Sequence, residues 1–215
     1  MAQAVIAARG GARAKSRCAA VLSAKDREAL TAVMLDDMLA ALARCDEIAG
    51  AWVVTPTAEL AQLAAGRGAQ VVLQAEPATL NAAFALATAR IREIAPYEAL
   101  MLMPGDLPLL QADDLAAAVH LSRTHAVVLA PSYDGGTGLL GLRAGVAMAS
   151  EFGGGSFRRH AAAAARRGLS LALLEATSFS HDVDRPEDLL HVLEEGPGAR
   201  TAAFLRERLR PQVIP

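Results

Sequence analysis

The sequence predicts an α/β fold in which helices cover both faces of a mainly parallel, mixed sheet. Two observations predict it. Short apolar runs typical of buried strands alternate along the chain with amphipathic stretches typical of helices. The length of 215 residues suits one domain spanning 1–215. Because ligands bind outside the carboxyl ends of the strands in such sheets, the loops after the predicted strands are where function is expected.

The apolar runs and stripes place the elements in a definite order. The helix over 26–43 has Leu30 and Met34 on one apolar stripe, and Ser23 three residues before Asp26 is a helix-start signal. Proline is tolerated at the first helical position and so opens two of the helices. Strands are predicted at 5–8, 51–54, 70–73, 99–103, 126–130 and 171–174, and helices at 26–43, after Thr55-Pro56, at 79–94, 112–122 and 156–168, and as a pair opened by Arg185-Pro186.

Composition and charge exclude several classes of protein. A net charge of −2 and a sequence pI of about 6.2 argue against a nucleic-acid binder, which usually carries a basic stripe. Alanine supplies much of the 53% hydrophobic content, and no run approaches the ~18 apolar residues that span a membrane. The first residues lack the basic region of a signal peptide. We expect a cytoplasmic protein without a membrane partner, and a symmetric homodimer is the default association.

Three aspartates lie where a metal ion is expected. Asp106 directly follows a predicted buried strand, where a carboxylate is costly unless something compensates it. Asp182 and Asp184 are separated by one residue, so an extended segment directs both to the same side, and a cation would relieve their repulsion. Magnesium prefers such oxygen ligands. The alternatives are that Asp106 caps a turn and that Asp184 caps the helix opened by Arg185-Pro186.

Glycine-rich segments indicate an anion site. Residues 153–155 are three glycines running into a predicted helix, so backbone N–H groups and the helix dipole can bind a phosphate, with Ser156 capping the helix and donating its hydroxyl. A flexible loop is the alternative. Thr137 ends an Asp-Gly-Gly segment that by itself favours a plain turn. The basic loop over 9–17 suits a triphosphate or is a solvated loop. His160 could approach an anion from the helix after Ser156, and is more simply a surface or packing residue.

These segments resemble the guanylyltransferases of coenzyme F420 biosynthesis over roughly residues 5–190. The resemblance is carried by Asp-Leu-Pro-Leu-Leu at 106–110, Asp-Gly-Gly-Thr at 134–137, Phe-Gly-Gly-Gly-Ser-Phe at 152–157, Asp-Val-Asp-Arg-Pro at 182–186, Ala-Lys-Ser-Arg at 14–17 and Leu-Asn-Ala-Ala at 80–83. The chain departs from the family pattern at Arg9, where lysine is usual, and at Gly138, where asparagine is usual.

The resemblance implies a single Rossmann-like nucleotidyltransferase domain that uses Mg²⁺. Its activity would be transfer of GMP from GTP to a phosphorylated three-carbon acid: 2-phospho-L-lactate, phosphoenolpyruvate or 3-phospho-D-glycerate. The matching positions imply metal binding by Asp106, Asp182 and Asp184, with Glu76 at a second ion; acid binding by Thr137, Gly153 and Ser156; nucleotide binding by Arg9, Gly10, Lys15, Arg17 and Asn81; and catalytic roles for Asp106, Lys15 and Arg17.

Two other functions fit the same residues. The first is a nucleotidyltransferase of the same fold with another acceptor, such as a molybdopterin or an isoprenoid precursor, and a screen of acceptors would separate it. The second is a nucleotide- or phosphate-binding module without turnover. Retention of all three aspartates favours an enzyme, because a site without chemistry has less need of a metal clamp.

Overall fold

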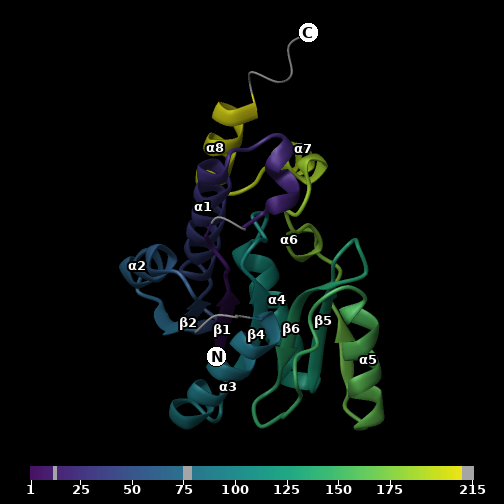
Figure 1. The fold of residues 1–215 in the computed structure, drawn as a ribbon. Coiled ribbons are helices and arrows are strands. Elements are labelled where there is room, and N and C mark those ends of the chain that lie inside the picture. The colour runs from purple at the N-terminus through teal and green to yellow at the C-terminus, as the bar shows by residue number, and fades with distance from the viewer. Residues whose placement is uncertain (12–13, 75–78, 210–215) are drawn as a thin grey trace.

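The computed structural model describes residues 1–11, 14–74 and 79–209, and within these ranges the predicted α/β fold is confirmed. A seven-stranded sheet runs in the order β3-β2-β1-β4-β6-β5-β7 (Figure 1). The paired strands lie parallel except for β6, which runs antiparallel to both of its neighbours. The strands are β1 (Ala2–Ala7), β2 (Ile48–Thr55), β3 (Gln70–Leu73), β4 (Ala99–Pro104), β5 (Val127–Pro131), β6 (Thr137–Leu142) and β7 (Leu171–Leu173).

Helices cover both faces of the sheet, and each face has its own apolar core. Buried side chains of α1, α2 and α4 pack on one face with Ile6 and Met101. Those of α3 and α5 pack on the other face with Val5 and Leu102, as the alternation of side chains along a strand requires. The helices that form these layers are α1 (Ala24–Leu42), α2 (Ala58–Gly66), α3 (Leu80–Ile94), α4 (Ala112–Thr124) and α5 (Ser156–Arg166).

A third cluster of buried side chains closes one end of the molecule. It joins the 3₁₀ helix η1 (Ser16–Ala20) and part of α1 to α7 (Pro186–Glu195) and α8 (Ala199–Leu209), which follow the short α6 (Thr177–Ser180). Asp37 of α1 accepts hydrogen bonds from the N–H groups of Arg200 and Thr201 and so caps the start of α8. This end layer holds the chain that leads to α7 above the sheet (Figure 1).

Most element boundaries agree with the sequence prediction, and one strand was missed. Ser23 caps α1 as predicted, accepting a hydrogen bond from the N–H of Asp26. Strand β6 was expected to be only a turn, but after the turn formed by Asp134 and Gly136 the chain continues as a fully buried strand. Because β6 is antiparallel, its first residue, Thr137, lies at the edge where the parallel strands end.

None of the helices in the described ranges combines the length and the apolar character needed to cross a bilayer.

Candidate active site

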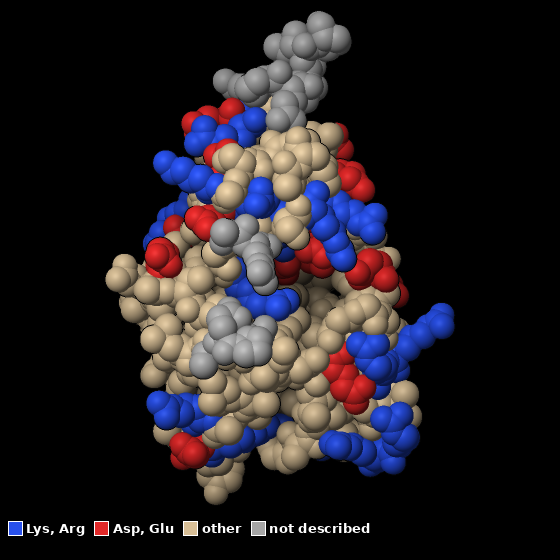
Figure 2. Space-filling view, viewed as in Figure 1, with Lys and Arg blue, Asp and Glu red and all other residues tan. Residues whose placement is uncertain are grey.

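Two cavities lie side by side at the carboxyl edge of the sheet and share a wall. We call the one beside the end of β1 the β1 cavity, with a volume of about 400 Å³, and the one beside the start of β6 the β6 cavity, of about 340 Å³. Figure 2 shows acidic and basic side chains gathered around a hollow in the middle of this face. Both volumes suit small-molecule ligands. The shared lining consists of Arg9, Leu80, Pro104, Asp106 and Asp184.

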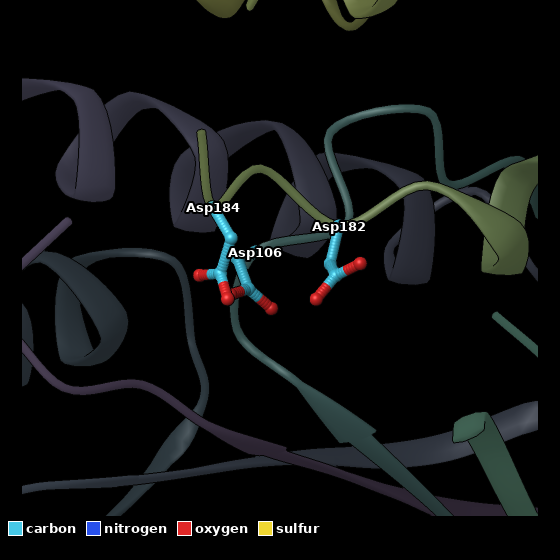
Figure 3. A group of neighbouring side chains, drawn as sticks. All are labelled: Asp106, Asp182 and Asp184. Carbon is cyan, nitrogen blue, oxygen red and sulfur yellow. The ribbon is translucent and has the colours of Figure 1, made fainter. Parts of the chain in front are cut away.

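Asp106, Asp182 and Asp184, which we call the carboxylate trio, converge here: Asp106 and Asp184 belong to the shared wall, and Asp182 lines the β6 cavity beside it. Each offers an oxygen atom within 4.8 Å of the others, and their carboxylates turn to the same side in Figure 3. The backbone explains the convergence. The N–H of Val183 donates to the carbonyl of Asp106 at 3.2 Å, and the Val183 side chain is fully buried. With Val183 turned into the core, alternation turns both flanking aspartates toward Asp106.

Asp188 shapes the segment that carries two of the trio. One oxygen of its carboxylate accepts from the N–H groups of Asp184 and Arg185, and the other accepts from the hydroxyl of Tyr133. The helix-start position before α7 is Arg185, with Pro186 as its first residue. The alternative in which Asp184 caps this helix is therefore not what the structure shows, and the Asp184 carboxylate stays directed at the shared wall.

The electrostatics of the trio fit a divalent cation. Burial raises the pKa of Asp182 to about 7, with further contributions from Asp106 and other nearby carboxylates. The Oδ1 atom of Asp106 is buried and has no hydrogen-bond partner among the described residues. A buried oxygen without a partner is costly unless a ligand satisfies it. The donor set is oxygen only, which matches the preference of Mg²⁺.

Lys15 and Arg17 contact the trio directly. The Nζ atom of Lys15 donates to Asp106 and, at 3.3 Å, to Asp184, while Arg17 Nη1 lies 3.2 Å from Asp184. Burial acts to lower the pKa of Lys15, but the attraction of Asp106 and Asp184 outweighs it and holds that pKa above its usual value. Lys15 has left-handed backbone dihedrals at φ 48°, which are costly for a residue with a side chain.

The glycine segment forms the far side of the β6 cavity. Gly155 has φ 68° and occupies the position just before α5, where its left-handed backbone favours glycine. Ser156 is the first residue of the helix rather than its cap, so the predicted capping role is wrong. Its N–H donates to the carbonyl of Gly153 at 2.9 Å, and this hydrogen bond closes the turn. No side chain caps the start of α5.

Beneath that turn lies a chain of buried polar side chains. The hydroxyl of Ser156 donates to Thr137 Oγ1 at 3.0 Å, and His160 Nδ1 lies 3.0 Å from the same oxygen. His160 Nε2 accepts the backbone N–H of Glu151 at 2.7 Å. His160 is fully buried, so it is not the surface residue that was one of the expectations. Burial lowers its pKa to about 4. The sequence held one signal: His160 follows Ser156 by four residues, on the same helix face.

The remaining predicted site residues divide into three groups. Gly10 lines the β1 cavity and Arg9 lines both cavities, and their contact with nucleotide stays a prediction. Asn81 lies at the start of α3, where its amide donates to the carbonyl of Phe152 at 3.1 Å and accepts the Phe152 N–H at 2.8 Å. It thus fixes the glycine segment, and its contact with nucleotide stays a prediction. Glu76 and part of the basic loop lie outside the described residues.

Gly138 of β6 lies in close contact with the backbone of α6. A Cβ atom built on Gly138 would lie 1.8 Å from the carbonyl oxygen of Phe179 in α6. A residue with a side chain is therefore incompatible with this backbone, although asparagine is usual in the family pattern. The close packing of α6 against β6 therefore requires glycine at position 138.

The chain is similar to known nucleotidyltransferases along almost its whole length. The 3-phospho-D-glycerate guanylyltransferase of Phenylobacterium zucineum (strain HLK1) is 52% identical over 212 residues, 96% of each chain. The phosphoenolpyruvate guanylyltransferase of Roseiflexus sp. (strain RS-1) is 36% identical over 194 residues, 90% of this chain and 85% of that one. A solved nucleotidyl transferase from Methanothermobacter thermautotrophicus shares the fold, with a TM-score of 0.64 at 16% identity, covering 96% of this chain and 99% of that one. The model of the family described as guanylyl transferase CofC like matches residues 2–215, and the chain belongs to this family.

Proposed function

We propose that the protein is a magnesium-dependent guanylyltransferase that transfers GMP from GTP to the phosphate of a three-carbon acid and releases pyrophosphate. The first acceptor to consider is 3-phospho-D-glycerate, because the relative that is 52% identical bears that substrate in its name. Phosphoenolpyruvate and 2-phospho-L-lactate are the other candidates. By the same family resemblance, the product would enter coenzyme F420 biosynthesis.

The carboxylate trio at the wall between two cavities is the observation that supports this proposal. Both proposed substrates are anions, and three carboxylates would repel them if nothing else were bound. A cation held by the trio would reverse this effect. The division of the site also suits two substrates: Gly10 and Lys15 of the basic loop border the β1 cavity, Thr137, Gly153 and Ser156 border the β6 cavity, and Arg9 borders both.

The chemistry requires positioning more than proton transfer. A phosphate oxygen of the acid attacks the α-phosphorus of GTP, the bond from that phosphorus to the β-bridging oxygen breaks, and pyrophosphate leaves with the bridging oxygen. The acid's phosphate is largely a dianion at neutral pH and is already a nucleophile, so no general base is required. Magnesium bound to the trio would supply charge neutralisation at the α-phosphate.

This chain's own residues would orient the two substrates. The Gly153–Ser156 turn and Thr137 would hold the acid in the β6 cavity, and Arg9 and Gly10 would contact the nucleotide in the β1 cavity. Lys15 in the β1 cavity and Arg17 in the β6 cavity bring positive charge to the carboxylate trio, where it would stabilise the leaving pyrophosphate. Fixing both reactants in one geometry contributes much of the rate enhancement in such reactions.

A competition assay tests the proposal. The protein is incubated with GTP, Mg²⁺ and equal amounts of the three acids, and products are identified by mass spectrometry while pyrophosphate is measured. We expect a guanylylated acid, chiefly from 3-phospho-D-glycerate. Asp106→Asn should lose at least a hundredfold in rate and bind Mn²⁺ more weakly. The substitution exchanges a neutral amide for the carboxylate whose Oδ1 atom is buried and unpaired.

Asp113→Asn is the matched control, since Asp113 is an exposed carboxylate in the first turn of α4. It should keep the wild-type rate. Pyrophosphate release from none of the three acids would refute the proposed function. A wild-type rate in Asp106→Asn would refute the assignment of the metal site while leaving the activity in place.

A further inference from the structure

The hydrogen bonds of His160 fix where its ring proton lies. Its Nε2 atom accepts the backbone N–H of Glu151 at 2.7 Å. A backbone amide can only donate, so Nε2 must present its lone pair. In a neutral imidazole the proton is then on Nδ1. The ring is neutral because burial lowers the pKa of His160 to about 4. His160 therefore donates to Thr137 Oγ1, 3.0 Å away.

This donation determines what the two hydroxyls can offer to a ligand. Thr137 and Ser156 have two hydroxyl protons between them, and one of these forms the 3.0 Å hydrogen bond that joins them. The other cannot be given to His160 Nδ1, because that atom is itself a donor. Both hydroxyl-bearing residues line the β6 cavity. The second proton is therefore available to a ligand oxygen in that cavity.

We propose that His160 is a positioning residue that makes the Thr137–Ser156 pair a hydrogen-bond donor toward an anionic oxygen of the acid substrate. The inference rests on the proposed function for the identity of that ligand. With the opposite tautomer, Thr137 would donate inward to Nδ1, and the pair would present only lone pairs to the cavity. An anion would then be repelled at this point. Glu151, through its backbone N–H, selects the tautomer that avoids this.

The tautomer can be measured without any turnover. Protein with ¹⁵N-labelled histidine is studied by long-range ¹H–¹⁵N NMR at neutral pH, and the His160 signals are identified among the five histidines by their loss in His160→Asn. We expect a protonated Nδ1 and an unprotonated Nε2. The reverse assignment would overturn the inference, whatever the protein's activity is.

Two substitutions separate the two hydrogen bonds of the ring. His160→Asn places an N–H where Nδ1 lies and keeps the donation to Thr137, but it leaves the Glu151 N–H without its acceptor. His160→Gln places an oxygen where Nε2 lies and keeps the Glu151 bond, but it loses the donation to Thr137. Each variant loses one buried hydrogen bond, so their melting temperatures should fall by similar amounts.

Their kinetics should differ in one parameter. The KM for 3-phospho-D-glycerate should rise severalfold in His160→Gln, because without the Nδ1–H donor nothing directs the Thr137 hydroxyl proton to the cavity, and clearly less in His160→Asn. The KM for GTP should be the same in both. Equal KM values for the acid would overturn the inference. If the wild-type protein turns over none of the acids, the proposed function fails instead, and the NMR measurement still decides the direction of the hydrogen bonds.

Discussion

The close approach of α6 to Gly138 predicts that even a methyl group at this position is strongly destabilising. In Gly138→Ala the new Cβ would lie 1.8 Å from the Phe179 carbonyl oxygen and 2.7 Å from its carbonyl carbon. Carbon and oxygen do not approach so closely without a bond, so β6 and α6 must separate by more than about 1 Å. The obstacle is backbone rather than a flexible side chain, and Phe179 itself is fully buried.

Overpacking of this kind costs about 1–3 kcal/mol, and a protein of this size loses about 2–4 °C in Tm for each kcal/mol. Gly138→Ala should therefore lower Tm by about 2–12 °C in calorimetry, with a matching loss in urea unfolding. Because Thr137 is the neighbouring residue, the KM for the acid should rise as well. The Gly138→Asn variant, which restores the family pattern, should be destabilised at least as much.

Gly66→Ala is the control, since a Cβ on Gly66 at the end of α2 meets no atom within 4 Å. It should unfold at or slightly above the wild-type temperature, because alanine favours helix over glycine. If Gly138→Ala unfolded together with this control, β6 and α6 would not lie as close as described. The argument that Gly138 is required by packing would then be refuted.

Three further predictions concern the site. Lys15→Met should bind Mn²⁺ more tightly in a titration followed by electron paramagnetic resonance, because the ammonium that neutralises the carboxylate trio is gone; weaker binding would contradict the arrangement described. Asp182 has its pKa raised from 3.8 to about 7, so the metal-free folded state binds more protons than the unfolded state within that window, and stability should fall as pH rises through it. Asp182→Asn should remove this part of the slope in urea unfolding, and curves that stay parallel to the wild type would count against the shift. Asn81→Ala loses both hydrogen bonds to the Phe152 backbone, so the glycine segment should loosen and the KM for the acid should rise; an unchanged KM would mean that the segment holds its shape alone.

The sequence predicted the parallel part of the fold well because each of those strands is a short apolar run with turn residues after it. Strand β6 was missed for a physical reason. Its sequence, TGLLGL, follows a strong turn signal and contains two glycines, which weaken strand propensity. Burial between β4 and β5 provides the stability that local preference lacks. That kind of stabilisation is tertiary and leaves little trace in a local pattern.

In the candidate site, too, local features could be predicted from the sequence and tertiary contacts could not. The convergence of Asp182 and Asp184 could be predicted because alternation along an extended segment is a local property. The contact of Lys15 with the trio could not, because it depends on a left-handed backbone conformation and joins residues that are 91 positions apart in the sequence. His160 was undervalued for a similar reason. Its four-residue spacing from Ser156 is a weak signal, and only its contacts with Thr137 and the backbone of Glu151 point to a role.

The shared wall between the two cavities has a consequence for how this protein family diversifies. Apart from Asp184, the residues described around the β1 cavity come from the chain up to Asp106. Those around the β6 cavity come mostly from positions 104–156 and 182–184. In the proposed function, donor and acceptor would thus be bound mainly by successive stretches of one polypeptide, with Arg9, Arg17 and Leu80 of the earlier stretch also reaching the β6 cavity. A chimaera that exchanges the later stretch between relatives should exchange acceptor preference while inheriting the nucleotide choice of the earlier one.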